Sequence, residues 1–202
     1  MQWLLVLSAL VAIFLALRPN RFSDATISVI LSLIWLWTGA VYHLWFFTRI
    51  NPAANLFAAL FMVQAAIFWY AGLTRKSLIF RIRLDVYGVA GALMIFYALI
   101  GYPILGQALG RIYPQSPTFG LPCPTTIFTF GLLLWAEKKV PSYVWLIPLV
   151  WSLIGFSAAI TLNIREDHGL VLAGIVGTVL ILWRDTRHSG RSHRTEHPKE
   201  LI

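Results

Sequence analysis

The sequence predicts an all-α integral membrane protein, a bundle of seven transmembrane helices with the N-terminus outside and the C-terminus cytoplasmic. Hydrophobic residues make up 58% of the chain and charged residues 12%, with a mean hydropathy of +0.74, far from soluble averages. The apolar residues come in long blocks without regular alternation, which favours helices over an outer-membrane barrel. Lys and Arg concentrate in alternate connections between these blocks. The fifth helix is predicted to be broken at Pro122-Cys123-Pro124.

Charged and turn-forming residues divide the chain into seven apolar segments, which we assign to one transmembrane domain, residues 1–183. The first segment has no positive n-region and no small-residue cleavage site, so it is predicted to be a span and not a signal peptide. It is shorter than the ~20 residues that a span needs. We therefore expect a late start, or a tilted or partial helix. The segments are 2–17, 25–48, 53–73, 86–109, 120–136, 143–161 and 168–183.

The distribution of basic residues predicts the orientation. Thirteen of the sixteen Lys and Arg lie in the first, third and fifth connections or in the tail, and the other three lie in the remaining connections. The positive-inside rule places the richer side in the cytoplasm. Those thirteen are Arg18, Arg21, Arg75, Lys76, Arg81, Arg83, Lys138, Lys139, Arg184, Arg187, Arg191, Arg194 and Lys199.

This charge distribution also predicts partners. The loop 74–84 alternates basic and apolar residues, so we expect it along the cytoplasmic leaflet, in contact with anionic lipid. The tail 184–202 is polar and basic, and is expected to be disordered near the same lipids. A metal site at His188, His193 and His197 is the alternative. The lipid bilayer accounts for the net charge of +8, and no nucleic-acid partner is predicted. Contacts with other membrane proteins or with further copies of the chain stay open.

The stretch FGLPCPTTIFTFG, residues 119–131, interrupts the fifth segment. Proline lacks a backbone donor and restricts the residue before it, so the helix is expected to begin near Pro124, with Cys123 as its cap. From 124 to 136 a helix covers about 20 Å, against a hydrocarbon core of ~30 Å. Non-helical backbone at that depth must be buried in protein or line a wet cavity.

A helix that starts inside the membrane predicts a binding site there. The free N–H groups of Thr125 and Thr126 and the positive helix end would face the cavity. The same position lowers the pKa of a thiol, which makes Cys123 a candidate ligand or nucleophile. The alternative is a short helix preceded by a buried extended loop, with Cys123 as a small apolar filler.

Further polar residues are predicted on the outer side. His43, one turn from Gly39, and Tyr42 lie inside the outer boundary of the second span, and Asn51 turns that span into the third. In the alternative interpretation His43, Tyr42 and Trp45 form an interfacial belt.

The fourth and sixth connections contribute Tyr113, Asp167 and His168 as further pocket candidates. Asp167 can instead be a helix N-cap, with Arg165 and Glu166 as a surface pair. If His43, Cys123 and His168 converge with Asp167 or Glu166, they offer ligands for zinc or copper. Their spacing does not require convergence, so no cofactor is predicted.

Three strings resemble a family of bacterial integral membrane proteins known only as a domain of unknown function. They are LIWLWTGAVYHLWFFTRINPAANLFAALF, YALIGYPILG and FGLPCPTTIFTFGLLL, with GLPCPTTIFTFG the most specific. The resemblance extends to about residue 183 and excludes the tail. It implies a polytopic protein of the bacterial cytoplasmic (inner) membrane and supplies no activity or catalytic residue.

The first functional hypothesis is binding or translocation of a small solute or ion through an outward-facing pocket at the broken helix. The alternatives are a non-catalytic subunit or scaffold of a larger membrane complex, and a metal-binding or thiol redox protein at the outer face. No lysine lies within a span, which excludes a retinal Schiff base. No catalytic residue is assigned.

Overall fold

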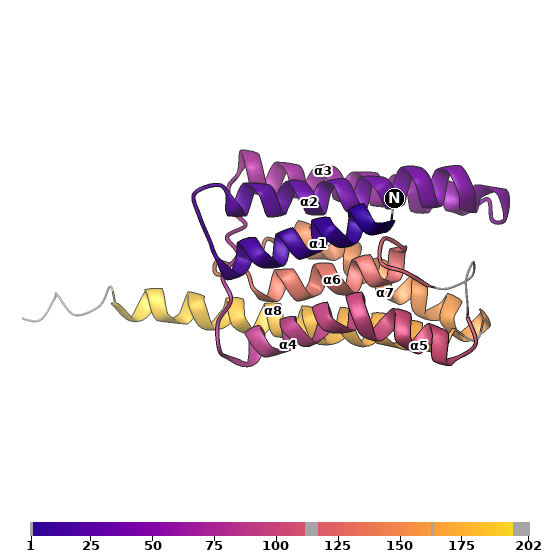
Figure 1. The fold of residues 1–202 in the computed structure, drawn as a ribbon. Coiled ribbons are helices and arrows are strands. Elements are labelled where there is room, and N and C mark those ends of the chain that lie inside the picture. Colours follow the sequence, from indigo (N-terminus) through magenta and orange to yellow (C-terminus); the bar gives the residue numbers. More distant parts are fainter. Residues whose placement is uncertain (1, 112–116, 163, 196–202) are drawn as a thin grey trace, which may run out of the picture.

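The structure is a computed structural model that describes residues 2–111, 117–162 and 164–195. These residues form seven helical rods, one for each predicted segment (Figure 1). The rods are α1 (Gln2–Leu17); α2 (Ser23–Trp37), continued by η1 (Thr38–Phe46) and η2 (Phe47–Arg49); α3 (Ala54–Trp69) with η3 (Tyr70–Thr74); α4 (Val86–Phe96) with η4 (Tyr97–Gly101) and α5 (Tyr102–Ala108); α6 (Pro122–Leu134); α7 (Ser142–Leu162); and η5 (Arg165–Asp167) with α8 (His168–Thr195).

Four helices in the described part of the chain are long and apolar enough to cross a membrane, as expected for a membrane protein. Three further apolar helices are shorter. The four long ones are Ser23–Arg49, Ala54–Thr74, Val86–Ala108 and Arg165–Arg187, and the shorter ones are Gln2–Leu17, Pro122–Leu134 and Ser142–Ser157.

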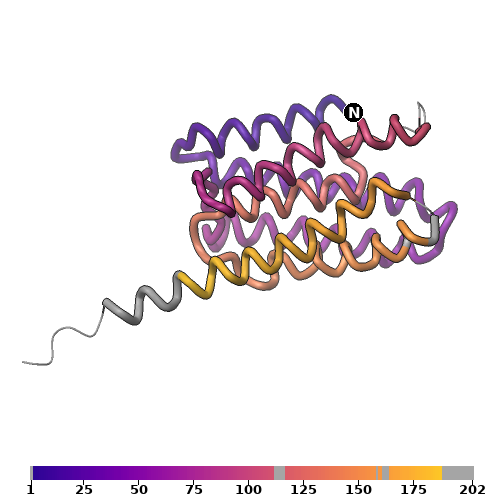
Figure 2. Tube along the Cα trace, turned by 90° about the horizontal axis from the view of Figure 1, so that it is seen from below, coloured from indigo at the N-terminus to yellow at the C-terminus, as the bar shows by residue number. Residues whose placement is uncertain are grey.

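Successive rods run in opposite directions along one long axis, so alternate connections gather at the same end (Figures 1 and 2). One end carries the connections 18–22, 75–85 and 135–141 and the last turns of α8, which hold most of the Lys and Arg; we name it the basic end. The opposite end carries the connection 50–53, residues 109–111 and 117–121, and the start of η5. We name it the cavity end, after the cavity described below.

Helix α6 lies at the centre of the bundle, with α2 and α3 on one side and α4 and α8 on the other (Figure 1). All thirteen of its residues except Cys123 are buried. Close approach to α4 needs glycine on both helices: a Cβ on Gly91 would lie 2.7 Å from the carbonyl oxygen of Gly131, and one on Gly131 would lie 2.8 Å from that of Gly91. The shortest apolar rod is therefore the one most enclosed by protein.

A guanidinium group closes the basic end of α6. Arg184 is 1% exposed, and its Nη1 donates to the carbonyl oxygens of Leu133, Leu134 and Ala136 at 3.0, 3.2 and 2.8 Å. These are carbonyls of the kind that a helix C-terminus leaves without intrahelical donors. Its Nε donates to Asp185, whose other carboxylate oxygen accepts the N–H of Val140.

The segment predicted as a disordered tail begins within a helix in the structure. Helix α8 continues through Arg184 and Asp185 to Thr195, and the side chains of Arg184 and Asp185 are buried. The candidate metal ligand His197 lies outside the described residues, as does the end of the predicted tail.

The loop before α4 packs on the end of the bundle. The apolar side chains of Leu78 and Phe80 are buried in the bundle, and the contact of the loop with anionic lipid stays a prediction. The N–H of Phe80 donates to Asp24 at 2.9 Å, and Arg81 forms an ion pair with the same carboxylate at 2.8 Å. The alternation of basic and apolar residues thus reflects a segment folded over the bundle end, with Arg75 and Lys76 exposed.

Asp85 caps the start of α4. Its carboxylate accepts the N–H groups of Tyr87 and Gly88 at 3.0 and 2.9 Å and pairs with Arg83. Burial alone would raise the pKa of Asp85, but the hydrogen bonds from Gly88, Arg83 and Tyr87 outweigh it and lower the pKa below the ordinary 3.8.

Candidate functional site

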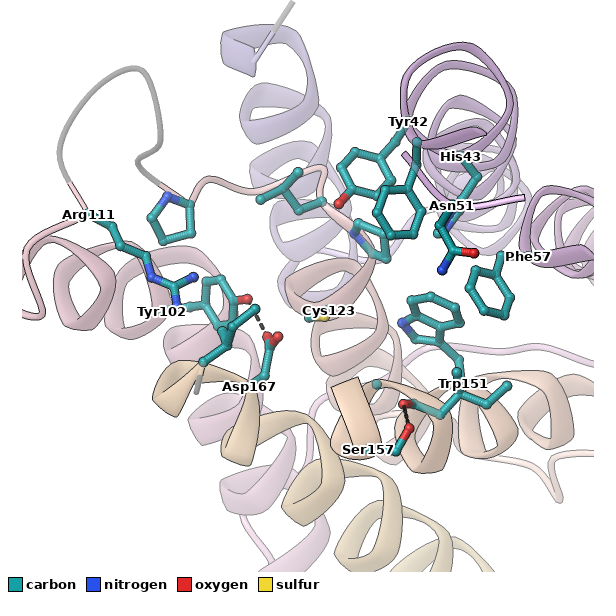
Figure 3. A pocket seen from close by; sticks show the side chains of 17 residues that line it. Tyr42, His43, Asn51, Phe57, Tyr102, Arg111, Cys123, Trp151, Ser157 and Asp167 are labelled. Atoms are coloured by element: carbon teal, nitrogen blue, oxygen red, sulfur yellow. Dashed lines mark hydrogen bonds between the residues drawn. The ribbon is translucent and has the colours of Figure 1, made fainter. Parts of the chain in front are cut away.

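A cavity of about 510 Å³ lies where α6 begins, between η1, α3, α5, α7 and η5. This volume is within the range of about 300–1,000 Å³ found for small-molecule pockets. Figure 3 shows aromatic side chains on one side of Cys123 and polar side chains on the other. The lining residues are Tyr42, His43, Phe47, Asn51, Phe57, Tyr102, Arg111, Pro117, Leu121, Pro122, Cys123, Trp151, Ile154, Gly155, Ser157, Ile164 and Asp167.

The backbone around the start of α6 explains why a cavity can exist there. The helix begins at Pro122, after Leu121 in an extended conformation and Gly120 at φ +98°, so the backbone up to this point is not helical. Prolines at the first and third helical positions remove two of the donors that a helix start leaves unpaired. Of the first three residues, Cys123 alone carries a backbone N–H.

Two details of the predicted helix start are therefore wrong. Cys123 is the second residue of the helix and not its cap, because Pro122 already has helical geometry. The N–H of Thr125 is not free, since it donates to the carbonyl of Leu121 at 3.1 Å. The prediction placed the helix start two residues too late, at Pro124. It therefore counted the Thr125 N–H as free, although this group donates to Leu121 once the helix begins at Pro122.

One side of the cavity, here called the aromatic wall, consists of Tyr42, His43, Phe47, Phe57 and Trp151. The His43 ring lies 5.1 Å from Trp151 and 5.8 Å from Phe57, centroid to centroid. His43 is fully buried, and neither ring nitrogen has a hydrogen-bond partner in the described structure. The indole N–H of Trp151 is also buried and unpartnered. The aromatic wall thus contains buried nitrogen atoms that have no hydrogen-bond partner.

The widened helical segment η1 and Gly39 account for the inward position of His43. A Cβ on Gly39 would lie 3.1 Å from the carbonyl oxygen of Ala58, so glycine lets η1 approach α3 closely. The belt interpretation is wrong for His43, which points into the bundle. Trp45 is 65% exposed, and the Arg49 guanidinium lies over its ring at 6.0 Å. π-helical segments like η1 are frequent at functional sites.

The other side of the cavity, here called the polar wall, consists of Tyr102, Arg111, Cys123 and Asp167. The Tyr102 hydroxyl donates to the Asp167 carboxylate, which is 6% exposed (Figure 3). Cys123 lines the same wall of the cavity. Asp167 is the last residue of η5 and its carboxylate accepts the Tyr102 hydroxyl, which corrects the simpler interpretation of Asp167 as a helix N-cap.

Glu166 lies behind the polar wall. It is fully buried, and its carboxylate forms an ion pair with Arg111 at 3.0 Å, without the geometry of a hydrogen bond. The predicted surface pair of Arg165 and Glu166 is therefore wrong. Gly106 leaves the space for this arrangement, since a Cβ there would lie 2.1 Å from Pro117 and 3.6 Å from the Glu166 carboxylate.

The structure brings five of the nine candidate pocket residues to this cavity: Tyr42, His43, Asn51, Cys123 and Asp167. Thr125 and Thr126 are fully buried in α6 and do not line it; the Thr126 hydroxyl donates to the Pro122 carbonyl. His168 is exposed, and its Nδ1 lies 2.8 Å from the Arg165 carbonyl. Tyr113 lies outside the described residues.

The metal hypothesis is not supported by this geometry. Within the residues that the structure describes, no three His, Cys, Asp or Glu side chains form a group that could hold a metal ion. His43 and Cys123 line the cavity, whereas His168 is exposed and does not line it.

Three residues that line the cavity were not predicted from the sequence: Phe57, Trp151 and Tyr102. Trp151 lies in a uniformly apolar helix, where nothing in the sequence separates it from an aromatic residue that faces lipid. Tyr102 comes directly before Pro103, and a tyrosine buried at a proline inside a span was the available signal.

Comparison with known proteins gives a family and no activity. Residues 1–192 match DUF6064, a family of unknown function. Neither the comparison with curated proteins nor that with solved structures found a match. The match covers the seven rods, the cavity and nearly all of α8. The chain belongs to the family DUF6064.

Proposed function

We propose that this chain is a seven-span protein of the bacterial cytoplasmic membrane whose cavity binds, or passes, a small solute or ion. The cavity would open outward, with the basic end in the cytoplasm, following the positive-inside rule. Support comes from the four long apolar helices and from the alternating directions of the seven rods. The non-helical residues 117–121 would complete the crossing begun by α6. Phe119 among them is 2% exposed, as backbone sheltered by protein requires.

The observation that carries the binding proposal is the set of unpaired polar atoms around the cavity. His43 Nδ1 and Nε2 and Trp151 Nε1 are buried without partners. Each such atom costs about 1–3 kcal/mol in a folded protein. Each of these atoms has less than 1 Å² of exposed surface, so a ligand in the cavity would reach them only when the surrounding rings shift, and a hydrogen bond made then would remove this cost.

Labelling of Cys123 tests the proposal, because the chain has no other cysteine. A small membrane-impermeant thiol reagent is added to right-side-out and to inside-out vesicles. Two control variants in a Cys123→Ser background mark the two ends: Ile50→Cys, at a site 81% exposed at the cavity end, and Ser142→Cys, at an exposed site of the basic end.

We expect Cys123 to react in right-side-out vesicles, as the Ile50→Cys variant does, and the Ser142→Cys variant to react in inside-out vesicles. Reaction of Cys123 from the basic side would overturn the orientation. A thiol that reacts only after denaturation would overturn the open cavity and leave the scaffold hypothesis in its place.

A further inference from the structure

The charges around the cavity leave one carboxylate without a basic partner. Among the described lining residues, Arg111 and Asp167 are the two with full formal charges, and His43 adds an imidazole. Arg111 already forms an ion pair with Glu166 directly behind the wall. No ion pair joins Asp167 to a basic side chain in the described structure. One guanidinium therefore faces two buried carboxylates.

The aromatic wall favours the same charge in a ligand. The rings of Tyr42, Phe57 and Trp151 face the cavity opposite Asp167 (Figure 3). Aromatic faces attract cations, most strongly when water is excluded. An inorganic cation would meet Asp167 but leave the apolar volume unfilled. An anion would meet two carboxylates.

From this we infer that the cavity binds a small organic ammonium ion, with its charge at Asp167 and its apolar body against Tyr42, Phe57 and Trp151. The inference rests on the proposed function, since it names the ligand class of that cavity. An ammonium group supplies the charge that Asp167 lacks, and the apolar body fills the aromatic side.

Charged thiol reagents test this inference at Cys123, which lies between the two walls (Figure 3). The rate of modification by 2-(trimethylammonium)ethyl methanethiosulfonate is compared with that by the anionic 2-sulfonatoethyl reagent. Both form the same kind of disulfide and release the same sulfinate. The ratio of the rates therefore cancels the intrinsic reactivity of the thiol. The ratio is normalised to that of the exposed Ile50→Cys variant.

We expect a normalised preference for the cationic reagent of about tenfold, the size expected for one nearby charge that is only partly screened. Asp167→Asn, which keeps the acceptor for Tyr102, should reduce the preference to near one, and Asp167→Glu should keep it. Trp151→Leu should lower it by about threefold, whereas Trp183→Leu, a change at an exposed site of the basic end, should not.

Three results would contradict the inference: equal rates for the two reagents, a preference for the anion, or a cation preference that survives Asp167→Asn in a variant that elutes as folded protein. In each case Cys123 still reacts, so the proposed function stands. If neither reagent reacts before denaturation, the proposed function fails together with the inference.

Discussion

The two ends of α6 differ in how their polar groups are satisfied. At the basic end, the Arg184 guanidinium donates to three carbonyls around the helix C-terminus, and Asp185 accepts the Val140 N–H. At the cavity end, the neighbouring groups His43 and Trp151 are equally buried but have no partners. Polar residues at one end therefore stabilise the fold, while those at the other carry an unfavourable free energy that a ligand can remove. This difference is the reason for proposing that binding takes place at the cavity end.

Replacing Arg184 should have the largest effect on stability. Arg184→Met keeps an unbranched side chain but leaves the carbonyls and Asp185 without the guanidinium. We expect a loss of about 3–5 kcal/mol in the free energy of unfolding, measured by denaturant titration in detergent micelles. The control is Arg187→Met, at an exposed site where the guanidinium lies over the Trp183 ring, with an expected change within about 0.5 kcal/mol. Equal effects of the two changes would contradict the role assigned to Arg184.

Two tryptophans offer a matched comparison between the ends. Trp135 and Trp151 are 5% and 6% exposed, but the Trp135 indole donates to the Gly88 carbonyl at 3.0 Å, whereas that of Trp151 has no partner. Trp135→Phe should therefore destabilise the protein by about 1 kcal/mol more than Trp151→Phe. The same titration measures both. A larger loss for Trp151→Phe would mean that its N–H is bonded in the folded protein.

The Asp85 cap makes the basic end sensitive to acid. Because the folded-state pKa of Asp85 is lowered, its ionised carboxylate stabilises the fold above pH 3.8, and this contribution is lost as the pH falls through the folded-state pKa. Asp85→Ala should cost about 1 kcal/mol at pH 6. The difference between wild type and variant should shrink below pH 3.8. A difference that stays constant down to pH 3 would contradict the assigned cap.

The smallest effect on stability is expected at His43. His43→Phe keeps an aromatic ring among Phe57, Phe61 and Trp151 and removes two unpartnered nitrogens. The free energy of unfolding should stay within about 1 kcal/mol of wild type or rise. A loss above about 2 kcal/mol would show that the imidazole makes a bond that stabilises the fold.

The sequence predicts the helices much better than it predicts the cavity. Apolar blocks between charged residues place the seven rods, since hydropathy depends on local composition. The choice of partners depends on the three-dimensional arrangement. Glu166 follows Arg165 in sequence yet pairs with Arg111, which a loop brings beside η5. The sequence around His43 is compatible both with an interfacial belt and with a buried cavity wall. The close packing at Gly39, which sequence does not predict, places His43 in the wall.

The start of α6 shows which features of the site can be predicted from the local sequence and which cannot. The prolines correctly predict a helix that begins deep in the apolar region, because they follow a rule about backbone donors. They do not reveal that Thr125 and Thr126 lie inside the bundle while Pro122 and Cys123 line the cavity. That outcome depends on the rotation of α6 against its neighbours, which hydropathy does not determine when nearly every residue of the helix is buried.

The most direct test of the difference between the two ends compares the reactivity of a thiol at each end of α6. The rate of modification of Cys123 in the folded protein is measured against that of Leu134→Cys in a Cys123→Ser background; Leu134 is 2% exposed at the last residue of the helix. We predict that Cys123 reacts with a small water-soluble reagent before denaturation, while the thiol at position 134 reacts only afterwards. Equal protection of both thiols would contradict the central claim that this helix is closed at one end and faces an accessible cavity at the other.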